Sequence, residues 1–168
     1  MNHKNTENIE NTENKKNTEN KKPVLLVSAC LLGVECRYDG ACQHIPTFDQ
    51  YLPTLMDKYQ VVPVCSEVYG GLTTPRDPAE RRDGKVITKT GHDVTTSFVN
   101  GAKQVLKLAK LYDAKLAILK QRSPSCGHGK IYDGTFSGKL IDGSGVTAQM
   151  LLEHGVEIYG EEQAGLLI

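Results

Sequence analysis

The sequence predicts an α/β domain with a mainly parallel sheet that is covered by helices on both faces. Four short apolar runs of strand length alternate along the chain with segments of helical periodicity. Strands that are separated by helices need crossover connections, which make neighbouring strands parallel and place helices on the faces of the sheet. The part of the chain that carries this pattern, residues 23–168, has the usual length of one domain with one core.

Residues 1–22 are predicted to form a disordered, low-complexity tail. Asparagine recurs at every third position from Asn2 to Asn20, a rhythm that fits neither a helix nor a strand. After Met1 the segment holds one sizeable apolar residue, Ile9, so it cannot bury enough surface to offset the entropy of ordering. We therefore expect the domain to comprise residues 23–168.

The first half of the domain is predicted to contain two strands with a helix between them. The apolar run at residues 24–28 is the first strand, and a loop rich in Gly and Cys follows it. A helix is expected over residues 47–58, although Pro53 is unfavourable inside a regular helix. Residues 60–64 form the second strand.

The middle of the chain combines a long irregular stretch with the clearest helix. Gly and Pro punctuate residues 70–85 and predict a loop, after which residues 86–88 are expected to form a short hairpin arm. A helix begins after Asp93, a favourable N-cap residue. Its apolar residues are spaced four, three, four and three apart and predict a buried face: Phe98, Ala102, Val105, Ala109 and Tyr112.

The last part of the chain contains two further strands and a helix. Residues 116–119 form the third strand, and residues 131–141, which include two glycines, are expected to be a β-hairpin or an irregular excursion. Residues 146–154 form the last helix, which Gly155 closes. Residues 156–159 form the fourth strand. This pattern does not give the order of the strands in the sheet.

Composition excludes several classes of protein. The formal net charge is zero, so a general polyanion-binding surface is not indicated. No stretch approaches the roughly 20 apolar residues of a membrane span, and no secretory signal is visible. Five cysteines without an export signal predict a cytoplasmic protein, in which thiols serve as metal ligands or catalysts more often than as disulfides.

Three cysteines lie at or just beyond the carboxyl ends of three predicted strands. Cys30 follows the first strand, Cys65 ends the second, and Cys126 lies on the loop after the third. The carboxyl ends of parallel strands converge on one crevice, where open α/β sheets bind ligands. Three thiolates from three loops can hold a metal centre and leave one position free for catalysis.

The type of metal centre is left open by the spacing of the cysteines. Soft thiolates select zinc, copper(I) or iron–sulfur clusters, and no C-x-x-C pair is present. A closed zinc site needs a fourth ligand, for which Cys36, His44 and His128 are candidates. A [4Fe–4S] cluster on three cysteines would instead keep one iron exposed to substrate. Cys42 is expected to be structural.

Five segments carry a resemblance to a known family. They are SACLLGVECRYDG, PVCSEVYGGLTTPR, GHDVT, LKQRSPSCG and IYDGTFSG, and in this order they resemble the bacterial domain family of unknown function that includes thiouracil desulfidase. The resemblance runs from about Val24 to Tyr159. Ser66 stands where the family leads us to expect proline.

The resemblance implies a single Rossmann-like three-layer domain that carries a [4Fe–4S] cluster on Cys30, Cys65 and Cys126. The implied activity is a non-redox desulfidase reaction, in which thiouracil and water give uracil and hydrogen sulfide. The acid–base carboxylate and the hydrogen-bonding serine of the family correspond to Glu67 and Ser123. Glu67 is two residues past Cys65, so an extended backbone would place both side chains on the same side of the chain.

Three further residues are weaker candidates for contact with the substrate. Cys36 lies in the same loop as Cys30 and is a candidate redox or catalytic thiol. Arg76 has the fork geometry to bind a phosphate or carbonyl, or it pairs with a neighbouring carboxylate such as Asp77 or Glu80. Asp39 suits a turn before Gly40 as well as it suits a substrate contact.

Two alternative functions remain beside the desulfidase. The thiols of a metal-binding or redox-sensing module would hold zinc or an iron–sulfur cluster without catalysis. A desulfidase with another substrate would act on thiolated nucleotides or tRNA. Neutral charge and the lack of an added RNA-binding domain favour a small-molecule substrate over nucleic acid, and neither NAD nor ATP is indicated, since no dinucleotide or P-loop motif is present.

Overall fold

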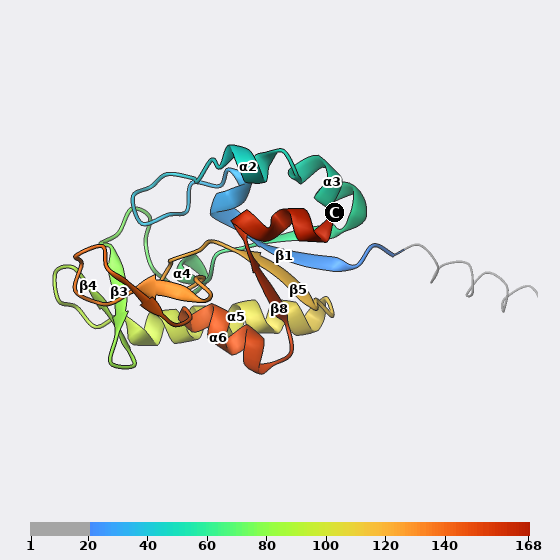
Figure 1. The fold of residues 1–168 in the computed structure, drawn as a ribbon. Helices are drawn as coiled ribbons and strands as arrows, with labels where there is room; N and C mark the ends of the chain where they lie inside the picture. The colour runs from blue at the N-terminus through green and yellow to red at the C-terminus, as the bar shows by residue number, and fades with distance from the viewer. Residues whose placement is uncertain (1–20) are drawn as a thin grey trace, which may run out of the picture.

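A central sheet of four parallel strands organises the structure, a computed structural model that describes residues 21–168 (Figure 1). The strands lie in the order β2-β1-β5-β8. Their bounds are Val24–Ser28 for β1, Gln60–Val64 for β2, Leu116–Leu119 for β5 and Glu157–Gly160 for β8. The predicted parallel α/β fold is confirmed. All but the last two residues of the predicted tail, 1–22, lie outside the described residues.

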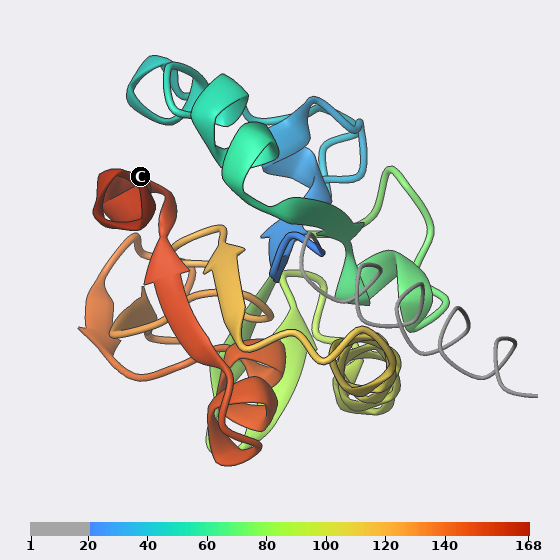
Figure 2. The ribbon, with the colours of Figure 1, turned by 90° about the vertical axis from the view of Figure 1, so that its right-hand side faces the viewer.

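Helices cover both faces of the sheet and complete three layers (Figures 1 and 2). One face is covered by α5 (Thr95–Leu111) and α6 (Val146–Glu153), and the other by α2 (Pro46–Asp49), α3 (Leu52–Lys58) and the C-terminal 3₁₀ helix η2 (Glu161–Leu167). Within the described residues no helix has both the length and the apolar character to cross a membrane.

Side chains of the central strands alternate between two apolar cores. Leu25 and Val27 of β1 pack on the side of α2, α3 and η2, with Phe48 and Leu55. Leu26 of the same strand belongs to the core under α5 and α6. Because both faces are buried, β1 is apolar at almost every position rather than at every second one, as expected for a central parallel strand.

Two β-hairpins lie at the end of the sheet where β1 ends (Figure 1). One is formed by β3 (Ala79–Arg82) and β4 (Lys85–Thr88), the other by β6 (Lys130–Tyr132) and β7 (Leu140–Asp142). The second hairpin confirms one of the two expectations for residues 131–141. The prediction of a loop over residues 70–85 is wrong for β3, whose strand is set by pairing with β4, and the charged sequence of β3 carries no apolar alternation to indicate it.

The predicted helix over residues 47–58 is divided into α2 and α3. Gln50 and Tyr51 separate the two helices, and the Tyr51 carbonyl oxygen accepts a hydrogen bond from the Leu55 amide at 2.9 Å. Pro53 lies in the first turn of α3, where an amide hydrogen has no helical partner and the missing N–H costs nothing. The proline thus starts a second helix rather than disturbing one.

The clearest predicted helix is α5, which begins at Thr95, and its N-cap residue is Val94 instead of the predicted Asp93. The Asp93 carboxylate accepts hydrogen bonds from the amide and the hydroxyl of Thr95, the first residue of the helix, and these bonds hold the pKa of Asp93 below its usual value. Four of the five predicted face residues are buried. The exception is Tyr112, which lies beyond the helix end and is partly exposed.

A close contact between α4 (Ser66–Tyr69) and α5 fixes the segment that follows Cys65. A Cβ atom at Gly101 would lie 1.8 Å from the Ser66 carbonyl oxygen, and one at Gly70 would lie 2.0 Å from the Ser97 carbonyl oxygen. The two helices therefore touch backbone to backbone through a pair of glycines. The contact seats the start of α4 against a long, buried helix.

We expect Gly101→Ala to destabilise the protein by about 1–3 kcal/mol or more, the usual cost of overpacking. Helix propensity alone would make the alanine variant more stable by roughly 1 kcal/mol. The clash of the added Cβ atom with the Ser66 carbonyl oxygen should outweigh this gain and lower the free energy of unfolding. Urea unfolding followed by circular dichroism measures the change. Asn100→Ala, at the exposed neighbouring position, is the control and should be neutral or stabilising. An increase in stability for Gly101→Ala would contradict the close contact.

Candidate metal and substrate site

Three cysteine-bearing loops leave three neighbouring strands at one edge of the sheet. β2, β1 and β5 are adjacent, and Cys65 directly follows β2. Cys30 lies in the 3₁₀ helix η1 (Ala29–Leu32) after β1, and Cys126 lies on the loop after β5. The structure therefore brings together the three positions that the sequence placed at separate strand ends.

A cavity of about 810 Å³ opens at this edge. Its floor comes from the strand ends and its walls from the segment before α5 and from both hairpins. The predicted site residues that line it are Cys30, Cys36, Cys65, Glu67, Arg76, Ser123 and Cys126. Asp39, a candidate for substrate contact, does not line this cavity.

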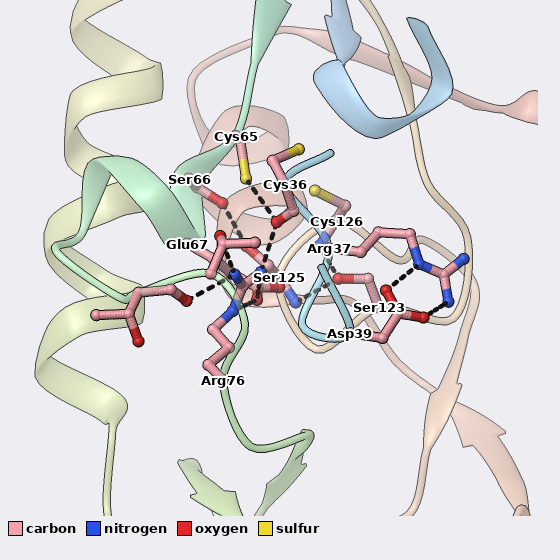
Figure 3. A network of polar contacts seen from close by, with 12 residues as sticks. Cys36, Arg37, Asp39, Cys65, Ser66, Glu67, Arg76, Ser123, Ser125 and Cys126 are labelled. Atoms are coloured by element: carbon pink, nitrogen blue, oxygen red, sulfur yellow. Dashed lines mark hydrogen bonds and ion pairs between the residues drawn. The ribbon is translucent and has the colours of Figure 1, made fainter. Parts of the chain in front are cut away.

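Cys36 lines the cavity beside Cys65 (Figure 3). Interactions with Cys30 and Cys65 shift the pKa of its thiol. The Cys65 sulfur also lies 3.9 Å from the Cys36 carbonyl oxygen. Four thiols therefore line the cavity, and Cys36 is a fourth sulfur at the site rather than a distant loop residue.

The thiols of Cys36, Cys65 and Cys126 resist ionisation in the metal-free protein. The pKa of Cys36 is raised to about 11, chiefly by its hydrogen bond with Cys30, and burial raises the pKa of Cys126 to about 12. The pKa of Cys65 is also raised, first by its hydrogen bond with Cys36 and then by burial. A bound metal has to displace these protons, since thiolates and not thiols are ligands.

The free energy of unfolding of the metal-free protein is expected to fall as the pH rises from about 9 to about 12. The unfolded chain releases thiol protons near the ordinary value of 9.0, whereas the folded chain retains them to higher pH, so alkali favours unfolding. Anaerobic urea unfolding under reducing conditions at several pH values measures the slope. Cys36→Ala should flatten it, and an unchanged slope in that variant would contradict the prediction.

Glu67 and Arg76 form a partly buried ion pair beside the thiols (Figure 3). The Arg76 Nε atom donates to the Glu67 carboxylate at 2.8 Å, and its Nη2 atom donates to the Cys36 carbonyl oxygen at 2.9 Å. Its Nη1 atom donates to Thr73 and Thr74. The partner of Arg76 is therefore Glu67, not Asp77 or Glu80 as the sequence suggested, and the guanidinium ties Glu67 to the loop of Cys36.

Ser123 closes the turn that carries Cys126. Its hydroxyl oxygen accepts the backbone amides of Ser125 and Cys126, each at 3.1 Å. These contacts use the oxygen as an acceptor and leave the hydroxyl proton available to donate toward the cavity that Ser123 lines. Both the turn and a substrate-binding role are compatible with this arrangement.

Asp39 acts on the cavity through Arg37. Its carboxylate accepts hydrogen bonds from the Nε and Nη2 atoms of Arg37, at 3.2 and 2.9 Å, and from the backbone amide of Ala41. Arg37 itself lines the cavity and is held there by Asp39. The sequence analysis considered Asp39 as a site residue but did not consider Arg37. The Arg-x-Asp-Gly pattern in the CRYDG segment could have indicated this pairing of Arg37 with Asp39.

The other candidate ligands lie elsewhere. His44 is exposed and faces Asp49 at 3.8 Å, whereas His128 contacts the Ser144 hydroxyl at 3.3 Å. Cys42 is partly exposed and, like both histidines, does not line the cavity. These positions give no support to a zinc site that is completed by a histidine.

The thiol set fits an iron–sulfur cluster better than a single ion. In residues 21–168, no three His, Cys, Asp or Glu side chains converge tightly enough to hold one metal ion. A [4Fe–4S] cluster bonds each thiolate to a different iron, so its ligands stand further apart than those of one ion. Soft sulfur donors that line one cavity are the ligand type that such a cluster binds.

Comparisons with known proteins give a family match and two similar proteins. Residues 25–163 match the 2-thiouracil desulfurase family. The chain is 43% identical over 150 residues to the uncharacterized protein YbbK of Bacillus subtilis (strain 168). The aligned region covers 83% of this chain and 97% of that relative. A solved structure of the [4Fe–4S]-dependent thiouracil desulfidase TudS is similar with a TM-score of 0.82 and 42% identity, over 87% of this chain and 95% of that one.

Proposed function

The chain belongs to the 2-thiouracil desulfurase family, and on this premise we propose that it is a [4Fe–4S]-dependent desulfidase of thiolated pyrimidines. Thiouracil and water would give uracil and hydrogen sulfide. The observation that carries the proposal is the convergence of Cys30, Cys65 and Cys126 on a cavity that also holds Glu67 and Ser123. The likeness to TudS, itself a [4Fe–4S]-dependent thiouracil desulfidase, supports it.

We assign the catalytic unit to residues 23–168. The family match covers residues 25–163, and the first strand begins at Val24. The lining of the cavity, as far as the structure describes the chain, falls inside these bounds.

Cys30, Cys65 and Cys126 would hold the cluster. A [4Fe–4S] cluster on three cysteines supplies, when bound, an iron with an open coordination position, a Lewis acid with affinity for a thione sulfur. Each of the three residues comes from a different strand end, so the fold rather than a local sequence motif sets their spacing. Cys36 would remain a protein thiol beside them.

Glu67 would act as the general base and acid. Arg76 holds its carboxylate at the cavity wall, next to the Cys65 loop. From there the carboxylate can take a proton from the attacking water and return it to a ring nitrogen of the pyrimidine. The C=S bond is broken and a C=O bond is formed without change in oxidation state, so the reaction consumes water and no electron donor.

Ser123 would orient the substrate or the water. Its hydroxyl oxygen is anchored by two backbone amides, which fixes the direction in which it donates. A positioned hydroxyl can hydrogen bond a carbonyl oxygen of the pyrimidine and hold the reacting carbon near the water.

A thiolated nucleotide is a second candidate substrate. The cavity volume of about 810 Å³ lies in the upper part of the roughly 300–1,000 Å³ range of ligand sites. Arg37 places a guanidinium at the wall, a group suited to bind phosphate. Comparing kcat/KM for thiouracil, a thiouridine monophosphate and thiolated tRNA distinguishes the three substrate classes.

The decisive experiment is anaerobic reconstitution with iron and sulfide, followed by quantitation and by incubation with thiouracil. We expect about four iron and four sulfide per chain, broad absorbance near about 400 nm, and release of uracil and sulfide. Purification with one tightly held zinc and no turnover would favour the non-catalytic metal-binding or redox-sensing module instead.

A further inference from the structure

A chain of buried hydroxyl groups connects the loop of Cys65 to the loop of Cys126. The Ser66 hydroxyl contacts the Ser125 hydroxyl (Figure 3). The Ser125 hydroxyl also contacts the Thr147 hydroxyl of α6 at 2.9 Å. All three side chains are almost fully buried, at 2%, 0% and 1% exposure. The proposed function assigns no role to any of them.

The packing around this hydroxyl chain leaves little room for adjustment. A Cβ atom at Gly145, just before α6, would lie 2.3 Å from the Ser125 carbonyl group. The amides of Thr147 and Ala148 both donate to the Ser125 carbonyl oxygen, at 2.9 and 3.2 Å. The Ser66 carbonyl is pressed against Gly101 of α5. Each hydroxyl is therefore held by backbone contacts as well as by its neighbour.

The hydroxyl chain ends beside Cys126, the residue that follows Ser125. Burial raises the pKa of Cys126, and the nearby Ser28 and Ser125 side chains oppose that rise. The Ser28 hydroxyl oxygen accepts the Lys120 amide at 2.9 Å, which leaves its proton free to donate. Ser28, at the end of β1, and Ser125, on the loop after β5, are therefore the hydroxyl groups available to the Cys126 sulfur.

The number of hydroxyl protons sets the donors and acceptors among Ser66, Ser125 and Thr147 when Cys126 is a thiolate. A thiolate only accepts hydrogen bonds, so a bond from Ser125 to the sulfur uses the single hydroxyl proton of Ser125. Its oxygen then accepts from both Ser66 and Thr147, which satisfies all three contacts. Charge-assisted hydrogen bonds of this kind are roughly twice as strong as neutral ones, and buried networks strengthen each member.

We propose that Ser66, Ser125 and Thr147, with Ser28, form a positioning network that holds the Cys65 and Cys126 loops in register and directs two hydrogen bonds onto the Cys126 thiolate. This inference rests on the proposed function for its cluster. The hydroxyl contacts that join the two loops, which we call the brace, are present in the cluster-free protein. Hydrogen bonds to ligand sulfurs tune the potential and stability of an iron–sulfur cluster.

The first test uses cluster-free, reduced protein and hydrogen exchange read by mass spectrometry. Ser66→Ala should accelerate exchange at least tenfold in residues 123–128, and Ser125→Ala should do the same in residues 65–70. Thr147→Val should accelerate both segments, whereas Thr147→Ser, which keeps the hydroxyl, should match the wild type. Acceleration confined to the substituted loop would overturn the brace.

The second test uses the reconstituted protein. Ser125→Ala should lose iron to a chelator about 10–100-fold faster than the wild type, the range typical of lost hydrogen bonds to metal ligands, and its cluster should have a more negative reduction potential. Ser66→Ala should change both quantities in the same direction. Unchanged release and potential would overturn the role toward Cys126. If the wild type takes up no cluster, the proposed function fails, while the exchange experiment still decides on the brace.

Discussion

Cys30→Ser, Cys65→Ser and Cys126→Ser proteins are each expected to lose the cluster and the desulfidase activity. Each substitution replaces one soft sulfur ligand by a hard hydroxyl, and no second thiol extends from the same strand end at Cys65 or Cys126. Cluster affinity should fall by more than about 100-fold, beyond the effect of losing a supporting hydrogen bond. Iron and sulfide content after anaerobic reconstitution, with thiouracil turnover, measures both losses.

Cys36→Ser is the matched control, because Cys36 lies in the same cavity and its carbonyl oxygen lies 3.9 Å from the Cys65 sulfur. Its iron and sulfide content should stay close to that of the wild type. Loss of the cluster in Cys36→Ser together with its retention in Cys30→Ser would show that the loop after β1 binds through its second cysteine. That result would reassign one ligand and keep the three-strand arrangement.

Local sequence was sufficient to predict the strands of the sheet. β1, β2 and β5 occupy the residues expected, since each is a compact apolar run bounded by polar residues or breakers. Strand order was not predictable, because it is set by the packing of helices on the two faces and leaves no mark within a strand. The start of α3 at Leu52 shows the same limit, as Pro53 is equally compatible with a break and with a first turn.

The sequence predicted the thiols of the site. It did not predict the polar contacts that hold the loops around these thiols. The rule that parallel strands converge at their carboxyl ends was enough to bring Cys30, Cys65 and Cys126 together. Arg76 was paired with the wrong carboxylate, because its contact with Glu67 depends on how a long loop folds back over α4. The contact between Ser66 and Ser125 joins residues 59 positions apart, which no spacing rule reveals.

Glu67→Gln is expected to lower kcat for thiouracil by about 10²–10⁴-fold, the usual contribution of a general base. The amide keeps the size of the side chain and an oxygen that can accept from Arg76, so cluster content and KM should change little. Steady-state kinetics normalised to iron content separates this loss from a loss of cluster. A fall in iron content parallel to the fall in kcat would instead assign Glu67 a structural role at the Cys65 loop.

Two further variants identify the carboxylate that moves the proton. Arg76→Lys keeps a cation but cannot bridge Glu67 and the Cys36 carbonyl with a planar fork, so it should lower kcat less than Glu67→Gln does. Glu80 also lines the cavity, but its carboxylate accepts the Phe136 amide at 3.0 Å and so supports the loop between β6 and β7. A larger loss of kcat in Glu80→Gln than in Glu67→Gln, at equal iron content, would transfer the role of base to Glu80. The ion pair with Arg76 would then serve to hold the Cys36 loop against α4, and Glu80 instead of Glu67 would pass the proton to the pyrimidine.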